Sequence, residues 1–262
     1  MKTIAAVRKI PALVPLLTAL ILGSSALAQS TNFTFDTGTV GLPPSGWTVG
    51  VQPSAGSTVA VTSAQFVSPS NSLEIRDMGD FTLGASYMYK LGLGSAYLPY
   101  HSNDLFAFDA RFSTNTANQF RFQLWNSASA AYGSYMNVLV NNGQVKAQYG
   151  TSSLLETNLG VTIIPNVWYS FRVNVTPVSN YYGLSVVSNG TVLGQVDHLA
   201  LNPDVPDGAI FINDGWVNSG QTGQSSVFID NIFFGAIPEP SGIALVGLGA
   251  LGIALLKRRV RR

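Results

Sequence analysis

LFAFDARFS (residues 105–113) and NQFRFQLWN (118–126) decide the fold class of this 262-residue chain. Apolar and polar side chains alternate in both stretches, which is the period-two pattern of a β-strand with one buried face. The segment TNTAN between them predicts that the two strands form a hairpin. The polar face of that hairpin would carry Asp109, Arg111, Arg121, Gln123 and Trp125.

Similar short runs, rich in Val, Phe, Tyr and Thr and separated by Gly, Asn, Pro and Ser, continue on both sides. Further strands are predicted at NFTFD (32–36), STVAVT (57–62), SLEIRD (72–77), ASYMYK (85–90), SYMNVLV (134–140), QVKAQY (144–149), VWYSFRVNV (167–175), YYGLSVVS (181–188), TVLGQV (191–196), AIFIN (209–213) and SVFIDNIFF (226–234). Asn142-Gly143 predicts a tight turn. About thirteen strands without a helical period favour an all-β, two-sheet jelly-roll sandwich.

The N-terminus has the order of a secretory signal. Lys2, Arg8 and Lys9 precede an apolar run, and Ala26-Leu27-Ala28 offers small residues for cleavage after Ala28. We therefore expect a signal peptide at residues 1–28, removed by signal peptidase, and a folded domain at residues 29–236.

The C-terminus combines an apolar stretch with a basic end. Residues 241–256 contain no charge and would cover about 24 Å as a helix, close to the hydrocarbon core of about 30 Å. Four glycines in this stretch suit a membrane helix, and the five Lys and Arg residues of 257–262 favour a cytoplasmic end. The sequence predicts a transmembrane helix at about 241–256.

Pro238, Glu239 and Pro240 precede that helix, and the two prolines favour an extended backbone. Together, the motif, the short helix and the basic tail (residues 237–262) resemble the PEP-CTERM sorting signal. The resemblance implies recognition by exosortase, cleavage near the motif, and transfer from the cytoplasmic membrane to the cell surface or extracellular matrix of a Gram-negative-type bacterium. The alternative is a permanently anchored surface protein whose tail is never cut.

Composition limits what the domain can do. Of the 14 Lys and Arg residues, three lie in the signal and five in the tail, so six remain. Of the 13 Asp and Glu residues, only Glu239 lies outside the domain, so 12 remain and the formal charge of the domain is −6. This balance disfavours nucleic-acid binding, which depends on Lys and Arg contacts to phosphate. The absence of cysteine excludes disulfides and thiolate chemistry.

The domain also resembles concanavalin-A-like (laminin-G-like) sandwiches and carbohydrate-binding jelly rolls. TFDTGTVGLPPSGWTV (34–49) is similar to their entry strand, VWYSFRVNV to a central strand and SVFIDNIFF to the closing one. The resemblance implies a structural calcium ion between Asp36 and Asp230, since calcium prefers oxygen ligands. The alternative is that Asp36 caps a turn and Asp230 faces solvent. Asp204, Asp207 and Asp214 form a weaker candidate cluster.

No catalytic constellation is evident. The domain has only two glutamates, Glu74 and Glu156, and neither lies in the closely spaced carboxylate pattern of retaining glycosidases on this fold. His101 and His198 have no neighbouring nucleophile motif. We expect a non-enzymatic protein, with a glycan-active enzyme of the same fold as the alternative.

A carbohydrate site is the sharper functional hypothesis. Arg121, Gln123 and Trp125, with Asp109 and Arg111 nearby, combine a ring for stacking with groups that orient sugar hydroxyls. Trp168 and Arg172 would extend this site if their strand joins the same sheet, and loop contacts could come from Tyr181, Tyr182 and Trp216. The alternative is an unoccupied outer sheet face. We expect a structural or adhesive surface protein, with polysaccharide binding as a further hypothesis.

Overall fold

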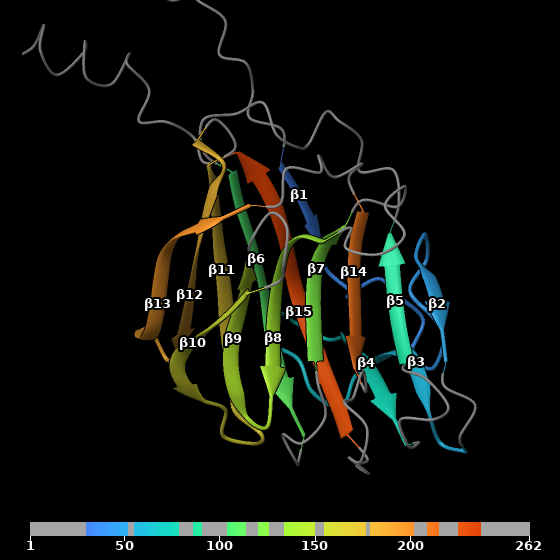
Figure 1. Ribbon diagram of the computed structural model, residues 1–262. Coiled ribbons are helices and arrows are strands. Elements are labelled where there is room, and N and C mark those ends of the chain that lie inside the picture. The colour runs from blue at the N-terminus through green and yellow to red at the C-terminus, as the bar shows by residue number, and fades with distance from the viewer. Residues whose placement is uncertain are drawn as a thin grey trace, which may run out of the picture. The chain divides into compact units, whose positions relative to one another are not determined.

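Two antiparallel sheets lie face to face in the computed structural model, and Figure 1 shows them as the layers of a sandwich. The structure describes residues 30–51, 55–78, 86–90, 104–113, 120–125, 134–149, 155–176, 179–201, 209–214 and 225–236. The predicted all-β jelly-roll sandwich is confirmed. Within the described ranges, no helix is long and apolar enough to cross a membrane. The predicted signal peptide and transmembrane helix lie outside these ranges.

The eight-stranded sheet, here called sheet A, has the order β13-β12-β11-β6-β15-β4-β3, and β1 also pairs with β15. Its strands are β1 (Ser30–Phe33), β3 (Thr58–Thr62), β4 (Ser72–Asp77), β6 (Asp104–Phe112), β11 (Trp168–Thr176), β12 (Tyr181–Ser188), β13 (Thr191–Ala200) and β15 (Ser225–Ala236).

The seven-stranded sheet, here called sheet B, has the order β10-β9-β8-β7-β14-β5-β2. Its strands are β2 (Thr48–Gly50), β5 (Ser86–Lys90), β7 (Phe120–Trp125), β8 (Ser134–Asn141), β9 (Gln144–Tyr149), β10 (Leu155–Thr162) and β14 (Ala209–Asp214). Asn142 and Gly143, with φ of 48° and 71°, form the predicted tight turn between β8 and β9.

Aromatic rings from both sheets meet in the core. Phe108 of β6 stacks on Phe122 of β7 with ring centroids 4.1 Å apart, and on Phe171 of β11 at 4.8 Å. Phe106 also contacts Phe122, at 4.6 Å. All four rings are almost fully buried. The apolar faces read from the sequence therefore form the layer between the sheets.

The predicted hairpin between residues 105–113 and 118–126 is wrong. β6 pairs with β11 and β15 in sheet A, whereas β7 pairs with β8 and β14 in sheet B. The reason is that both strands have a strongly apolar face, and these faces pack against each other across the sandwich. Consequently the polar faces of β6 and β7 point outward on opposite sides of the molecule.

Two strands were not predicted, β2 and β10. β10, with the sequence LETNLGVT, is an edge strand with mostly exposed or half-buried positions, so it lacks the apolar alternation that marks a strand. Gly194 of β13 lies against it. A Cβ at position 194 would approach Val161 Cγ2 to 2.5 Å and the Leu159 carbonyl oxygen to 2.6 Å. Glycine here allows the edges of the two sheets to meet.

Candidate functional site

A row of polar side chains crosses the outer face of sheet B. Strand pairing places Gln123 of β7 opposite Asn137 of β8, Asn137 opposite Gln148 of β9, and Gln148 opposite Glu156 of β10. Alternate residues of β7, β8 and β9 enter the core, so these four point away from it. We call Gln123, Asn137, Gln148 and Glu156 the polar row.

Hydrogen bonds connect most of the polar row. Lys146 Nζ donates to Glu156 Oε2 at 2.9 Å, and Gln148 Nε2 donates to Glu156 Oε1 at 2.9 Å. Asn137 Nδ2 donates to Gln148 Oε1. Because an ionised Glu156 only accepts, Gln148 must turn its NH₂ toward it and its oxygen toward Asn137. Asn137 must then present its own NH₂ to Gln148, and its Oδ1 remains for another partner.

That remaining atom is the unusual feature of the site. Asn137 is 1% exposed, and its buried Oδ1 has no hydrogen-bond partner among the described residues. Leaving a buried polar atom unpaired costs about 1–3 kcal/mol, and most buried side-chain polar atoms avoid it. Gln123 and Gln148 are also buried, at 9% and 8% exposure. The outer face of sheet B therefore holds a sheltered acceptor that a hydroxyl or amide donor would satisfy.

Two positively charged residues, Lys146 and Arg121, act on Glu156 of the polar row. Burial alone would raise the pKa of Glu156, but hydrogen bonds from Lys146 and Gln148 and the positive charges of Lys146 and Arg121 bring it below the usual value. Burial lowers the pKa of Arg121, and the charge of Glu156 opposes this effect. Arg121 remains a cation at neutral pH because its ordinary pKa is above 12.

A second polar cluster occupies the outer face of sheet A. Asp230 of β15 lies opposite Asp109 of β6, at an irregularity in the strand where Asn231 has a φ of 49°. Asn231 links them, because its Nδ2 donates to Asp109 Oδ2 at 2.9 Å and its backbone N–H to Asp230 Oδ1 at 2.8 Å. Ser170 Oγ also donates to Asp109.

Asp36 joins this acidic cluster through Ser68. The Ser68 hydroxyl lies 3.4 Å from Asp36 Oδ2 and 3.1 Å from Asp230 Oδ2. Asp230 is 0% exposed and also accepts the backbone N–H groups of Val67 and Ser68, at 2.9 and 3.0 Å. The structure thus brings together the two residues suggested for calcium, and the alternative in which Asp230 faces solvent is wrong.

The candidate sugar site is divided between the two sheets, which corrects its predicted composition. Arg121, Gln123 and Trp125 belong to β7 in sheet B, although the Trp125 side chain is outside the described part. Asp109 and Arg111 lie on β6 in sheet A. Trp168 and Arg172 of β11 accompany them, with Trp168 paired to Arg111. The misplaced hairpin caused the error, because it put two outward faces on one surface.

The remaining candidates contribute less. His198 is exposed and makes an edge contact with the ring of Tyr181, 5.9 Å between centroids, whereas Tyr182 is buried in the core. Burial and then the neighbouring Tyr149 raise the pKa of Tyr182 above its usual value. Several predicted residues lie outside the described ranges: Ala28, His101, Asp204, Asp207, Trp216, Pro238, Glu239 and Pro240.

Asn137, Lys146, Gln148 and Glu156 were not identified from the sequence as site residues. A signal was present, because Gln144, Lys146 and Gln148 alternate with apolar residues in QVKAQY, and Asn137 interrupts an apolar run in SYMNVLV. What the sequence lacked was the strand order that places Asn137 between Gln123 and Gln148.

Residues 236–261 match the family model of the PEP-CTERM protein-sorting motif. The chain carries a PEP-CTERM sorting signal. This motif implies export, a membrane-anchored sorting signal and processing by exosortase. A search of curated proteins found no match to the sequence.

Solved structures with a similar fold are lectin-like β-sandwiches. A sialidase matches with a TM-score of 0.56 and 11% identity, over 80% of this chain and 18% of that one, so this chain spans about a fifth of that protein. The cellulose-induced protein Cip1 matches with a TM-score of 0.53 and 13% identity, over 78% and 96%. Winged bean acidic lectin, in complex with methyl-α-D-galactose, matches with a TM-score of 0.50 and 9% identity, over 80% and 100%. The fold is a concanavalin-A-like sandwich.

Proposed function

We propose that this protein is released by exosortase to the cell surface or extracellular matrix, where its sandwich binds polysaccharide on the outer face of sheet B. The observation that carries the binding proposal is the buried, unpaired Oδ1 of Asn137. Sugar hydroxyls are donors of the required kind. Around this acceptor, Gln123, Gln148 and Arg121 supply the mixed donors and acceptors that fix the orientation of a ligand.

The binding proposal is tested with the full chain purified in detergent and probed on a polysaccharide array. We expect at least one polysaccharide to bind, and Asn137→Leu to abolish that binding because the acceptor is lost. Asn174→Leu is the matched control, since Asn174 is exposed on β11 at the outer face of sheet A. Equal binding by the wild type and Asn137→Leu would contradict the proposal.

Binding is favoured over hydrolysis by the positions of the two glutamates. Glu74 is on β4 in sheet A and Glu156 is on β10 in sheet B, each on an outward face. A glycosidase needs two carboxyl groups about 5–10 Å apart on either side of one bond. Glu74 and Glu156 cannot form such a pair. The carboxylate of Asp230, which lies close to Asp109 and Asp36, is 0% exposed and accepts three backbone N–H groups, so we propose a non-catalytic role. Release of reducing ends from any bound polysaccharide, lost in Glu156→Gln, would instead support the enzyme.

We also propose that the acidic cluster holds a structural calcium ion. The support is the oxygen chemistry of two carboxylates: Asp36 and Asp230 share one hydroxyl, and Asp109 lies across from Asp230. In the described part of the chain no three carboxylate or histidine side chains converge on one point, so backbone carbonyls or water would complete the coordination. Like charges opposite each other in a sheet are unfavourable, and a buried carboxylate requires compensation. Among the described residues, the ion pairs are Arg76–Glu74 and Lys146–Glu156, and neither reaches the cluster. Asp36, Asp230 and Ser68 would provide oxygen ligands.

Calcium binding is tested by thermal unfolding. Calcium is expected to raise the Tm of the wild type and EDTA to lower it, because a ligand that binds only the folded state stabilises it. Asp36→Asn should remove the response while keeping the fold. An unchanged Tm with calcium would exclude this site, and magnesium serves as the control for nonspecific ion effects.

The sorting proposal is tested by the intact mass of the surface form. Processing predicts a mass that lacks most of residues 241–262, whereas a permanently anchored protein keeps them. Replacing Pro238, Glu239 and Pro240 with alanine should retain the full-length form in the membrane fraction. Loss of the tail in this variant would show that processing does not require the Pro-Glu-Pro motif.

A further inference from the structure

A groove on the outer face of sheet A is separate from both the polar row and the acidic cluster. It has a volume of about 420 Å³ and is formed by β4, the end of β6 and the start of β15. Its lining residues are Glu74, Arg76, Met78, Ser113, Ser225, Ser226 and Phe228. This volume falls within the range of about 300–1,000 Å³ that is common for small-molecule sites.

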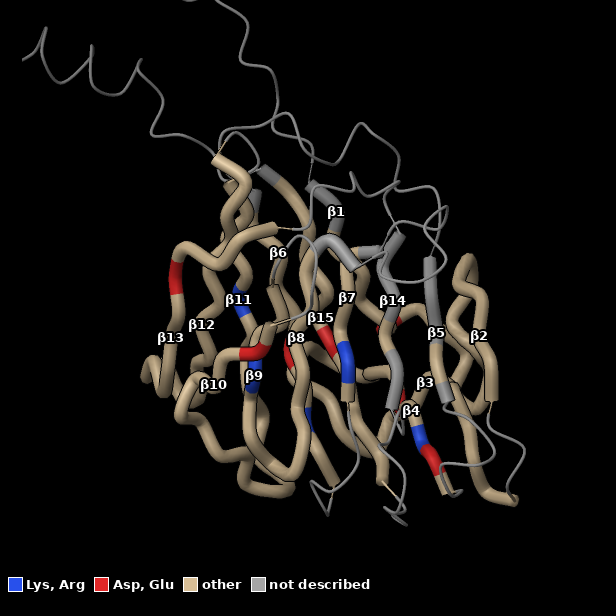
Figure 2. The backbone as a smooth tube through the Cα atoms, viewed as in Figure 1, with Lys and Arg blue, Asp and Glu red and all other residues tan. Residues whose placement is uncertain are grey.

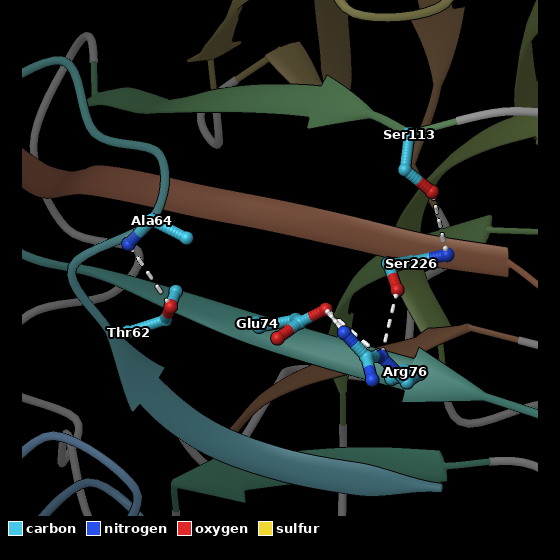
Figure 3. Close-up of polar contacts among 6 residues, drawn as sticks. All are labelled: Thr62, Ala64, Glu74, Arg76, Ser113 and Ser226. Atoms are coloured by element: carbon cyan, nitrogen blue, oxygen red, sulfur yellow. Dashed lines mark hydrogen bonds and ion pairs between the residues drawn. The ribbon is translucent and has the colours of Figure 1, made fainter. Parts of the chain in front are cut away.

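The polar wall of the groove is an ordered ion pair. Figure 3 shows Arg76 between Glu74 and Ser226. Arg76 Nε and Nη2 donate to the same carboxylate oxygen, Glu74 Oε1, at 3.0 and 2.8 Å, and Nε also approaches Ser226 Oγ at 3.3 Å. Among the described residues, no hydrogen bond uses Glu74 Oε2. The Arg76 side chain remains 42% exposed and that of Glu74 13%, so both reach the groove.

The apolar side of the groove is provided by Phe228 and Met78. Phe228 lies opposite Glu74 on one neighbouring strand and opposite Arg111 on the other. The Arg111 guanidinium covers part of the ring, with its carbon 5.6 Å from the centroid. An aromatic edge, an acceptor, a cationic donor and three serines therefore lie within one depression.

We propose that this groove binds one ring of a neutral sugar. Glu74 Oε2 accepts one ring hydroxyl, Arg76 donates to the neighbouring hydroxyl, and the apolar C–H face of the ring packs on Phe228 and Met78. Glu74 would repel a ligand that carries a carboxylate, and Arg76 would repel a cationic ligand. The paired charges therefore select an uncharged polyol.

The position of the groove gives this site a role distinct from that of the polar row. The two lie on outer faces of different sheets, so one sandwich would hold two polysaccharide chains and join them. This cross-linking role rests on the proposed function, whereas the groove itself does not.

The test measures oligosaccharide binding to the full chain in detergent by calorimetry and saturation-transfer NMR. The probes are cellohexaose, laminarihexaose and methyl-α-D-galactoside, with hexagalacturonic acid as the charged comparison. Arg76→Gln should weaken one class of neutral-sugar site about ten-fold, the effect of losing one hydrogen bond to a charged group. Arg172→Gln is the matched control, because Arg172 is an exposed arginine on the same face outside the groove.

A second variant keeps the test decisive if Arg76→Gln unfolds. Ser226→Ala leaves both charges in place and removes one hydroxyl from the groove, and it should weaken the same site by a smaller factor. Preference for hexagalacturonic acid, or neutral-sugar binding that neither groove variant changes, would overturn the proposal. Loss of binding in Asn137→Leu with an intact Arg76-dependent site would support both sites independently. An Arg76-dependent site with no Asn137-dependent binding would refute only the proposed function.

Discussion

The two faces of β7, β8 and β9 are both buried, but different forces hold them. On the inner face, Phe122, Val138 and Ala147 are 0% exposed and pack in the apolar layer. On the outer face, Gln123, Asn137 and Gln148 are at most 9% exposed and form part of a polar row. Figure 2 shows that charged residues are sparse along the described strands of the sandwich.

This comparison shows that burial alone does not identify a site. On the inner face, the side chains of sheet B pack directly against aromatic rings of sheet A. The outer face is different, because no donor from the described part of the chain reaches Asn137 Oδ1. A buried polar group with an unmet hydrogen bond indicates a ligand more strongly than a buried apolar group does.

Breaking the inner face should have the largest effect on stability. Phe108→Ala removes a ring stacked between Phe122 and Phe171, and should lower the free energy of unfolding by about 3–5 kcal/mol. Denaturant unfolding followed by fluorescence measures it. Phe66→Ala is the control, since Phe66 is 44% exposed. A cost below about 1 kcal/mol for Phe108→Ala would mean that the stack contributes little.

Asp230 is a buried polar residue that, unlike Asn137, has hydrogen-bond donors for its side-chain oxygens. Asp230→Ala leaves the N–H groups of Val67, Ser68 and Asn231 without their acceptor, and should cost about 3 kcal/mol in calcium-free buffer. Chemical denaturation with EDTA present gives this value. A stabilised variant would show that repulsion among the carboxylates exceeds the hydrogen bonds.

Asn137→Leu should separate stability from binding. It removes the unpaired acceptor but also the donor to Gln148, so we expect a stability change within about 1 kcal/mol. Polysaccharide binding should nevertheless be lost. Thermal unfolding and array binding on the same preparation test this. A loss of several kcal/mol would mark Asn137 as structural rather than ligand-binding.

The smallest effect is the pH dependence at Glu156. Its pKa in the folded state is below the usual value, so its ionised form stabilises the fold above the unfolded pKa of about 4.3, and this is lost as pH falls through the folded pKa. The Tm difference between wild type and Glu156→Gln should be largest above about pH 5 and shrink toward pH 3. The corresponding difference in the free energy of unfolding should remain below about 1 kcal/mol, because Glu156 is partly exposed. A difference independent of pH would contradict this assignment.

Local pattern was sufficient for thirteen of the fifteen described strands, the inward faces of the central ones, the Asn142-Gly143 turn and the sorting motif, because alternation and turn residues act over a few neighbours. It missed β2, which is three residues long, and β10, which lacks the alternation. It also suggested Asp36 and Asp230, through a resemblance. It was insufficient for the site: Asp109 and Arg111 were grouped with Arg121 although they lie on the opposite outer face.

The sequence by itself thus determined an all-β domain followed by a C-terminal sorting signal. Only the tertiary structure decided which outward residues meet, because strand order depends on how apolar faces pack across the sandwich. Phe108 and Phe122 lie 14 positions apart, and their stacking separates β6 from β7 into different sheets. The same pairing aligns Asn137 with Gln123 and Gln148, and so creates the acceptor on which the proposed binding function rests.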